Sequence, residues 1–576
     1  MNREDDSYTG AQGVARVIST MESPLVFGMP GGNTVQVFDA LRDYRDTVEC
    51  VLVREESIGT VMGEAHGRLT GRPAVVLAQG AWILGAGGIG VMEAHLAASP
   101  VVILLDATEG GSYSHHAPYQ AGFGGYGAYD LVTAMSAITK RTFFAIDPVQ
   151  AIQMTQLAIK HATEGEPGPV AVVFHSKSLL EEVSGEDRRR LFYDRSYSSP
   201  VPTSSDVMIA KAAAGIRNSS RPIIISGNGA RGPAATAALL ALAEQLDIPV
   251  ATTSGGKSTF PEVHPLSAGV IGSFGHDSAN ALVGDSDLII AVGTKLGATD
   301  TLDDNPAMID PRRQIIVQLD IEPLNISWTQ PVDHGLVGLV SEILPRLLSA
   351  SEGVAGGGAE RVMEERRRGG FFEDLSGLIA SEIAVNPRRL ARLLSDLLPD
   401  DAIVTCDAGE NRLFILHDYQ TSSGGIILQA NGGGGMGYAV PAGIAATYTH
   451  PGRTVVAVAG DGGFSMSLHS LMTAVENRRR MLVVVMDNQA LGWVLHGQGD
   501  RPFLSEFAEF GYADISEAIG CTVATAHSTE EVRDALVKSR DVPGVMVLVV
   551  KVSLDESYKT LQTEMAGRSH EEVLQA

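Results

Sequence analysis

The stretch from Thr454 to Val494 constrains the fold of this chain more than any other part of the sequence. An apolar, β-branched run leads to a tight turn at Gly460 to Gly462, a helical segment follows, and a second apolar run spans Met481 to Met486. Such a unit joins neighbouring parallel strands by a right-handed crossover. We therefore expect Asp461 and Asn488 at the carboxyl ends of two strands, which is the edge where open α/β sheets bind ligands.

The polar residues of this unit suit a metal ion that carries a diphosphate. Asp461 offers an anionic oxygen, Asn488 offers a neutral carbonyl oxygen, and the flanking glycines let phosphate oxygens approach the backbone. Mg²⁺ prefers octahedral oxygen ligation that the protein shares with phosphate. The alternative is an ordinary turn at Gly460 to Gly462 with Asn488 as a cap.

This pattern resembles the thiamine diphosphate (ThDP) signature, which starts at Gly-Asp-Gly and ends at an asparagine further along the chain. The resemblance implies that Asp461 and Asn488 bind the metal together with the main-chain carbonyl of Ala490. It also implies cofactor contacts from the residues beside these ligands, namely Gly460, Gly462, Gly463 and Leu491.

Alternating helical segments and apolar runs predict an α/β protein with three doubly wound parallel-sheet domains. This plan resembles the ThDP family that includes acetolactate synthase and pyruvate decarboxylase. The expected parts are a pyrimidine-binding domain (1–178), a middle domain (204–350), a diphosphate-binding domain (371–554) and a C-terminal tail (555–576) that is either a lid or a solvated end. A polar stretch (177–205) and a glycine-rich stretch (351–370) are interpreted as linkers.

Composition excludes several classes of function. The net charge of −25 argues against a nucleic-acid partner, because an acidic surface repels phosphate backbones. We find no apolar run that reads as a membrane span, and the polar, acidic N-terminus does not resemble a signal peptide. The cysteines Cys50, Cys406 and Cys521 share no CxxC spacing. We expect a cytoplasmic protein that acts on a small molecule.

Glu56 is the candidate for proton transfer. The segment Val53 to Ser57 ends an apolar run, starts a helix and resembles the family's V-R-H-E-Q, and Gly67 to Gly71 resembles the R-x-T-G that follows it. By this resemblance Glu56 bonds to the aminopyrimidine of ThDP, and burial would raise its pKa so that it shares a proton near neutrality. The alternative is a solvated glutamate at a helix start, and Glu55, where the family usually has histidine, is interpreted in that way.

Two glycine-rich loops match the family. Phe27 to Asn33 resembles its first glycine-rich loop, which implies that Gly28 and Gly31 lie near the active site; a simple turn is the alternative. Asn431 to Pro441 resembles G-G-x-G-x-M-G-x-x-L-P. This second match implies that Met436 wedges ThDP into a bent shape and that the carbonyl of Gly434 holds the pyrimidine amine.

A third segment, Asp407 to Asn411, follows an apolar run in the last domain. The family uses a turn here to hold the diphosphate, so Gly409 and Asn411 are candidates. Glu410 fits poorly beside an anion.

The substrate side departs from the family. Gln79 to Leu84 places Trp82 where relatives have a small loop, which should reshape the floor of the substrate pocket. His115 and His116 correspond to paired histidines that handle protons in pyruvate-decarboxylase-like enzymes, although loop histidines are often merely solvated. Gln120 falls near the Phe-Gln pair of acetolactate-synthase-like enzymes.

The middle domain resembles the acetolactate-synthase side of the family, some members of which hold FAD there. This resemblance rests on Thr252 to Lys257, Phe260 to Pro265 and Gly272 to Gly275. The segment Gly293 to Gly297 departs from the family's Arg-Phe-Asp pattern, so we favour a middle domain without FAD. A domain that holds FAD or an ADP moiety remains the alternative.

These features predict a ThDP- and Mg²⁺-dependent carboligase or lyase of the acetolactate-synthase-like group that acts on a 2-oxo acid or related carbonyl donor. The alternatives are a non-ligating 2-oxoacid decarboxylase, a 2-hydroxyacyl-CoA lyase and, from another class, a non-catalytic ThDP-fold regulatory protein. In this family ThDP lies between two subunits, with Glu56 from one and Asp461 from the other. We therefore expect a homodimer or homotetramer with active sites at the interface.

Overall fold

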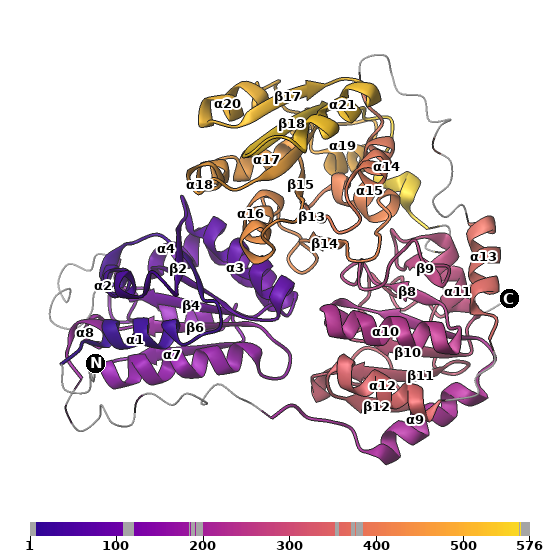
Figure 1. Ribbon diagram of the computed structural model, residues 1–576, viewed down its shortest axis with the longest axis horizontal. Coiled ribbons are helices and arrows are strands. Elements are labelled where there is room, and N and C mark those ends of the chain that lie inside the picture. The colour runs from indigo at the N-terminus through magenta and orange to yellow at the C-terminus, as the bar shows by residue number, and fades with distance from the viewer. Residues whose placement is uncertain are drawn as a thin grey trace.

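The computed structural model describes residues 7–107, 120–183, 200–351, 356–369 and 384–563, together with residues 185, 191, 375 and 565. These residues form three six-stranded sheets in which every strand pairing is parallel. Each sheet lies in its own lobe with helices packed around it, as Figure 1 shows. The predicted class of three α/β domains with parallel sheets is confirmed.

The first sheet has the strand order β2-β1-β3-β4-β6-β5. Its strands are β1 (Leu25–Gly28), β2 (Glu49–Leu52), β3 (Ala74–Gln79), β4 (Val101–Asp106), β5 (Arg141–Ala145) and β6 (Pro169–Phe174), and its helices are α1 (Gly10–Ser19), α2 (Val35–Leu41), α3 (Glu56–Thr70), α4 (Gly80–Gly85), α5 (Gly88–Leu96), α6 (Leu131–Ser136), α7 (Pro148–Thr163) and α8 (Ser176–Leu180). Strands β4 and β6 are buried at every residue, because helices cover both faces of a parallel sheet.

The second sheet has the order β12-β11-β10-β7-β8-β9. It consists of β7 (Pro222–Ser226), β8 (Val250–Thr252), β9 (Ser267–Val270), β10 (Leu288–Val292), β11 (Ile315–Asp320) and β12 (His334–Val337), covered by α9 (Asp206–Asn218), α10 (Pro233–Leu246), α11 (Asp277–Asp285), α12 (Val340–Ala350) and α13 (Gly358–Arg368). Separate apolar cores pack on its two faces. Helix α13 lies in the glycine-rich stretch that was interpreted as a linker, and it packs on α11.

The third sheet has the order β14-β13-β15-β16-β18-β17. Its strands are β13 (Ile403–Cys406), β14 (Ile426–Gln429), β15 (Val455–Gly460), β16 (Met481–Asp487), β17 (Thr522–Ala526) and β18 (Val545–Lys551), and its helices are α14 (Pro387–Leu397), α15 (Glu410–Asp418), α16 (Ala439–Thr449), α17 (Asp461–Ser467), α18 (Ser470–Glu476), α19 (Gly492–Gln498), α20 (Tyr512–Ile519) and α21 (Thr529–Ser539). Strands β15 and β16 pair with Gly460 beside Met486, so both end at the same edge.

Local structure differs from expectation at two places. The Gly460–Gly462 segment is not a separate turn, because β15 runs directly into α17, whose first residue is Asp461. The helical part of this unit is divided into α17 and α18. The segment from Gln79 to Leu84, which stands where relatives have a small loop, contains a helix start, since α4 begins at Gly80 immediately after β3.

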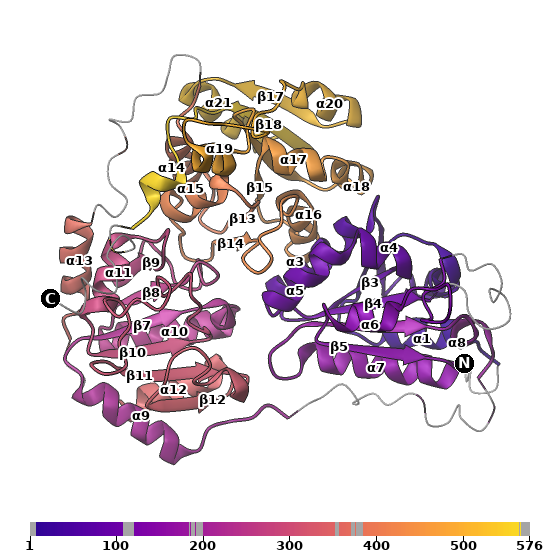
Figure 2. The same cartoon turned by 180° about the vertical axis from the view of Figure 1, so that it is seen from behind.

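Helix α3 of the first lobe packs against α16 of the third, and both views of the molecule show the two helices at the junction of these lobes (Figures 1 and 2). One buried core includes Ile58 and Met62 from α3 together with Ala442 and Ala446 from α16. The first and third domains of one chain are therefore joined by a shared core. Among the described residues, no helix is long and apolar enough to cross a membrane.

Candidate active site

A cavity of about 110 Å³ opens at the carboxyl edge of the third sheet. It gathers residues from the ends of β13, β15, β16 and β18, which are distant in sequence. Of the residues predicted for the cofactor and the metal, those that line it are Gly409, Asn411, Met436, Gly460, Asp461, Gly462, Gly463, Asn488, Ala490 and Leu491. The structure thus brings into one place the residues that the sequence separates by up to about eighty positions.

Three helices point their N-termini at this cavity. Helix α15 starts beside Gly409, α17 starts at Asp461 directly after β15, and α19 starts after Leu491. The free amides and the positive dipole ends of helices attract anions. Gly409 adopts a φ of 106°, which glycine tolerates and which turns the chain from β13 into α15. The cavity is therefore suited to a diphosphate.

Asp461 is buried, with 2% of its surface exposed. Its Oδ1 accepts a hydrogen bond from its neighbour, the amide of Gly462, at 2.7 Å, and its Oδ2 accepts one from the amide of Gln489 at 2.6 Å. Burial, and secondarily the charge of Asp487, raises the pKa of Asp461 to about 7. Asp487 itself forms an ion pair with Lys551 at 2.6 Å. The carboxylate at the end of β15 is thus held by backbone amides within reach of the cavity.

The loop after β16 presents Asn488 and Ala490 to the same cavity. Gln489 between them has a φ of 58°, a left-handed conformation that is uncommon for a residue with a side chain. Two main-chain hydrogen bonds hold this loop, from Leu491 N to Ser505 O at 2.8 Å and from Phe507 N to Gln489 O at 2.7 Å. Strain that neighbouring segments stabilise is common at ligand sites.

The donors around this cavity fit Mg²⁺ with a diphosphate better than a metal held by protein alone. No cluster of three or more His, Cys, Asp or Glu side chains that could hold a metal occurs in the described part of the chain. One carboxylate, one amide oxygen and one main-chain carbonyl leave octahedral positions for phosphate and water. Gly463 is packed closely against the loop after β13, since a Cβ there would lie 2.5 Å from Oδ2 of Asp407.

Glu410 also lines the cavity, and its carboxylate has hydrogen-bond partners of its own. Its Oε1 lies 2.8 Å from Nδ1 of His496 and accepts a hydrogen bond from the amide of Tyr558 at 2.9 Å. Nε2 of His496 lies 3.0 Å from the carbonyl oxygen of Leu554. The poor fit of Glu410 beside an anion is therefore relieved by a histidine and a backbone amide that the sequence did not indicate.

The glycine-rich loop 432–437 carries Met436 between two cavities. Gly434 and Gly437 have φ values of 63° and 86°. Met436 lines the cavity at Asp461 and also a second cavity of about 180 Å³ between the first and third lobes. Asp407, a residue that was not predicted to act here, accepts hydrogen bonds from the amides of Gly437 at 3.1 Å and Tyr438 at 3.2 Å. The sequence feature that could have indicated Asp407 is its position directly after a strand, which it shares with Asp461.

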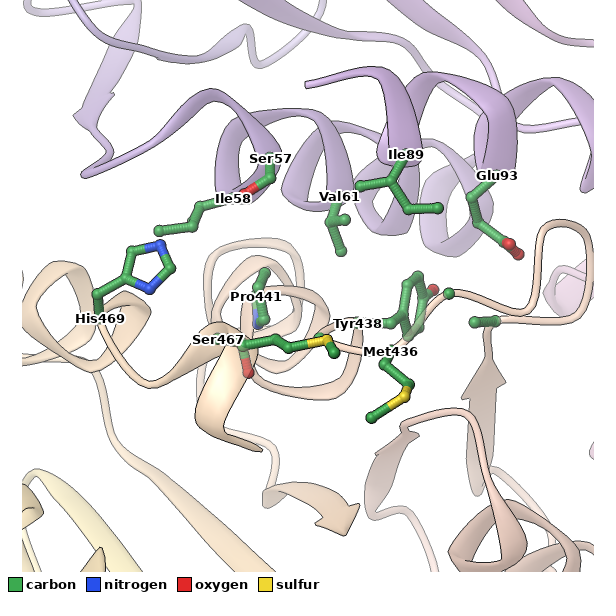
Figure 3. A pocket seen from close by; sticks show the side chains of 14 residues that line it. Ser57, Ile58, Val61, Ile89, Glu93, Met436, Tyr438, Pro441, Ser467 and His469 are labelled. Carbon is green, nitrogen blue, oxygen red and sulfur yellow. The ribbon is translucent and has the colours of Figure 1, made fainter. Parts of the chain in front are cut away.

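Glu56 is the first residue of α3, at the edge of this second cavity, which Ser57 and Ile58 line. Only 3% of its surface is exposed, and burial raises its pKa. Glu55, which was interpreted as a solvated helix-start residue, lies 3.3 Å from Nε2 of His469, and Figure 3 shows the His469 ring facing α3 across this cavity. Glu56 does not line the cavity at Asp461 of the same chain.

The remaining first-domain candidates lie at the carboxyl edge of the first sheet. Gly28 ends β1, and a Cβ on Gly31 would lie 3.2 Å from Oε1 of Gln79. The side-chain amide of Gln79 donates to Oε1 of Gln120. None of Gly28, Gly31 and Gln120 lines the cavity at Asp461. His115 and His116 lie outside the described residues.

Asp106 was missed as an organiser of this edge. It ends β4, is fully buried, and accepts hydrogen bonds from the amides of Asn33 at 2.7 Å and Gly80 at 3.3 Å. It thereby joins the first glycine-rich loop to the start of α4. Trp82 of α4 is 53% exposed and does not pack into the first core.

In the middle domain, the segment Gly293–Gly297 contacts the loop after β7. A Cβ on Gly227 would lie 2.4 Å from the carbonyl oxygen of Gly293, and the amide of Gly229 donates to the same oxygen at 2.9 Å. Lys295 forms an ion pair with Glu166 of the first domain. This segment therefore takes part in contacts between loops and between domains.

The oxygen ligands and helix N-termini at the cavity beside Asp461 lie at the carboxyl edge of a parallel sheet. This arrangement defines an α/β enzyme that depends on a diphosphate-bearing cofactor. Three family models match the chain: the N-terminal TPP binding domain of thiamine pyrophosphate enzymes at residues 8–122, the central domain at 209–347 and the C-terminal TPP binding domain at 407–550. Together they cover well over half of the sequence. The chain belongs to the thiamine pyrophosphate (ThDP) enzyme family.

Its curated relatives match along nearly the whole chain. A probable acetolactate synthase large subunit of Methanocaldococcus jannaschii is 28% identical over 547 residues, covering 92% of this chain and 89% of the relative. The acetolactate synthase large subunit of Corynebacterium glutamicum is 28% identical, covering 99% and 90%. The acetolactate synthase isozyme 3 large subunit of Escherichia coli (strain K12) is 25% identical, covering 99% and 98%.

Proposed function

We propose that the protein is a Mg²⁺- and ThDP-dependent carboligase of the acetolactate-synthase-like kind, which cleaves a 2-oxo acid or related carbonyl donor and joins the retained fragment to an acceptor. The cavity that gathers Asp461, Asn488 and Ala490 beside three helix N-termini carries the proposal. The names of the relatives support carboligation, because each is an acetolactate synthase large subunit aligned over most of both chains.

In this proposal, Oδ of Asp461, the side-chain oxygen of Asn488 and the carbonyl of Ala490 hold Mg²⁺. Gly409, Asn411 and the glycines from Gly460 to Gly463 bind the diphosphate through the N-termini of α15 and α17, and Leu491 covers it. The buried carboxylate is already directed by backbone amides, so little reorganisation accompanies metal binding.

Bound ThDP supplies a nucleophilic carbon and an electron sink for cleaving and forming carbon–carbon bonds. Met436 would support the cofactor between its two rings, and the main-chain carbonyl of Gly434 would accept a hydrogen bond from the cofactor's amine. Met436 is placed for this role because its loop lies between the two cavities.

Glu56 of the partner subunit would hold and move the proton on the cofactor's pyrimidine ring. A carboxyl with a pKa raised by burial is suited to share a proton near neutral pH. Glu56 does not line the cavity at Asp461 in its own chain, and this supports an active site completed by a second copy. We therefore propose a homodimer or homotetramer, located in the cytoplasm.

The substrate side would be formed by the first domain, with Gly28 and Gly31 in the loop next to the cofactor and Gln120 toward the substrate. Gln79 bonds to Gln120 and would orient it. His115 and His116 are proposed to transfer protons at the substrate. The domain limits proposed from sequence, 1–178, 204–350 and 371–554, place one sheet in each part.

The test uses purified protein with ThDP and Mg²⁺ and a panel of 2-oxo acids and 2-hydroxyacyl-CoAs, with and without aldehyde or second 2-oxo acid acceptors. Mass spectrometry should detect a product that contains donor and acceptor fragments and that depends on both cofactors. Aldehyde alone would instead indicate a decarboxylase, acyl-CoA cleavage a lyase, and no turnover a regulatory protein. Absorbance in the flavin bands of the purified protein tests for FAD.

The Glu56→Gln variant separates catalysis from cofactor binding. We expect it to retain ThDP but to exchange the proton at the reactive carbon of the cofactor much more slowly than the unmodified protein does. An unchanged exchange rate would contradict the assignment of Glu56.

A further inference from the structure

We propose that Glu93 is a positioning residue that fixes the Met436 loop, so that the first domain sets the cofactor geometry in the third domain of its own chain. This inference rests on the proposed function and deepens it. Glu93 lies on α5, in a segment with no resemblance to a cofactor motif, yet only 2% of its surface is exposed and it lines the cavity below α3. Figure 3 shows its side chain pointing from α5 toward the loop that carries Met436.

Both carboxylate oxygens of Glu93 accept hydrogen bonds from the backbone of that loop. Oε1 accepts a hydrogen bond from the amide of Gly432 at 3.0 Å, and Oε2 accepts one from the amide of Gly433 at 2.6 Å. Hydrogen bonds to an ionised acceptor are shorter and stronger than neutral ones. A carboxylate that receives two successive amides fixes the path of the chain as well as its distance from α5.

The other end of the same loop is held by a second carboxylate. Asp407 accepts hydrogen bonds from the amides of Gly437 and Tyr438. Met436 therefore lies in a short glycine-rich span between Glu93 of the first domain and Asp407 of the third. Glycine has the largest backbone entropy to lose on ordering, so such a span has a defined shape only when both ends are fixed.

Glu93 is held in turn by a buried charge network. Arg68 donates from Nη2 to Oε1 of Glu93 at 2.9 Å and from Nε to Oε1 of Glu64 at 2.7 Å. The hydroxyls of Ser99 and Tyr438 both donate to Glu64, each at 2.8 Å. Arg68 compensates the charge of Glu93, and Tyr438 links the network back to the loop.

Close packing allows the glycine-rich loop only one position against α5. A Cβ on Gly432 would lie 2.6 Å from Cβ of Leu96 and 3.1 Å from the amide nitrogen of Ala97. A Cβ on Gly435 would lie 2.9 Å from Cγ1 of Ile89. The loop thus approaches α5 closely enough that Glu93 acts directly on its backbone.

The first experiment compares Glu93→Gln with the unmodified protein. Glutamine keeps the shape of glutamate but offers one acceptor oxygen, so one of the two glycine amides faces an NH₂ group. Without cofactor, hydrogen–deuterium exchange in the peptide that contains Gly432 and Gly433 should be about tenfold faster. With saturating Mg²⁺, the dissociation constant for ThDP should rise about tenfold. ThDP affinity equal to that of the unmodified protein would overturn the proposal.

Two further variants separate positioning from simple destabilisation. Thr155→Ala removes a buried hydrogen bond from α7 of the first domain, outside the network around Glu93, so it should lower the unfolding temperature but leave ThDP affinity and loop exchange unchanged. Gly432→Ala keeps every charge but displaces the loop from α5, so it should weaken ThDP binding as Glu93→Gln does. Equal ThDP affinities for Thr155→Ala and Glu93→Gln would overturn the proposal.

Failure of the proposed function would look different. If the unmodified protein bound no ThDP, the assignment of the cofactor would fall. Loop exchange in Glu93→Gln would still decide whether Glu93 fixes the loop: faster exchange would support this role, and unchanged exchange would exclude it.

Discussion

The Glu55 carboxylate lies 3.3 Å from Nε2 of His469, so the residue before α3 of the first domain meets the residue before α18 of the third. Glu55 also accepts a hydrogen bond from the hydroxyl of Ser57. Its charge is one of the causes that raise the pKa of Glu56, after burial. The pair thus places a carboxylate, with a histidine as its partner, beside the proposed proton-transfer residue.

Glu55→Gln removes that charge and should lower the pKa of Glu56. The acidic limb of the pH profile of kcat/KM, where Glu56 becomes protonated, should move to lower pH, and only slightly, because Glu55 is partly solvated and its field is screened. His469→Gln leaves the Glu55 charge without its partner, so it should move the acidic limb to higher pH. Identical profiles for all three proteins would contradict this coupling.

Removal of divalent metal should release the cofactor. The proposed metal ligands Asp461, Asn488 and Ala490 offer oxygen atoms and no positive charge, so we expect the diphosphate to need the ion for strong binding. After dialysis against a chelator, ThDP should be lost, and adding Mg²⁺ should restore binding measured by calorimetry. Asp461→Asn should weaken ThDP binding at fixed Mg²⁺ by at least about tenfold. ThDP that stays bound through chelation would show that the metal assignment is wrong.

Met436→Ala should lower kcat more than it lowers ThDP affinity. The side chain lines two cavities. If it supports the cofactor as proposed, its removal should let the cofactor leave its reactive conformation. Misplacement of reacting groups by about 1 Å costs about a hundredfold in rate. Met436→Leu keeps the volume and serves as the control, with a decrease in kcat of less than about tenfold. The two variants should be compared at saturating ThDP, and equal kcat values would contradict a wedge.

His66 should make the protein acid-sensitive. It is 6% exposed on α3, and burial, followed by the charges of Arg72 and His450, lowers its pKa from 6.5 to about 4. In the unfolded state His66 is protonated below about pH 6.5, whereas in the folded state it stays neutral down to about pH 4. The free energy of unfolding therefore decreases as the pH falls from about 6.5 toward 4. The free energy of unfolding should decrease by about 2 kcal/mol between pH 7 and pH 5.

The measurement is the free energy of unfolding in urea at the two pH values. His66→Leu should show a pH dependence smaller by about that amount, whatever its effect on stability at pH 7. His95→Gln, at an exposed position on α5, should keep the dependence of the unmodified protein. A His66→Leu protein with an unchanged pH dependence would contradict the prediction.

Strands with continuous apolar runs could be predicted closely from sequence. The limits of β7 and β10 follow from the sequence, because Pro222–Ser226 and Leu288–Val292 are apolar runs bounded by polar or turn residues. The edge strands β9 (SAGV) and β12 (HGLV) cannot be recognised in the same way, because small and polar residues carry no periodic signal. Their neighbours in the sheet decide their conformation.

The residues of the candidate site also fall into those that the sequence predicts and those that it does not. Residues in contiguous motifs, such as Asp461 and Asn488, lie together in the structure as their strand ends predicted. Glu93 and Asp106 were not found, since their roles depend on contacts with backbone amides far away in sequence; Glu93 and Gly432 are 339 positions apart. A single sequence contains no local pattern for such a contact.

The core that α3 shares with α16 also limits how the enzyme can move. Hinge opening between the first and third domains of one chain would expose Ile58, Met62 and Ala442 to water, and a buried apolar side chain costs about 1.5–3 kcal/mol to expose. These two domains should therefore behave as one rigid body during turnover. Substrate entry and product release then fall to segments outside that core, which can rearrange without breaking it.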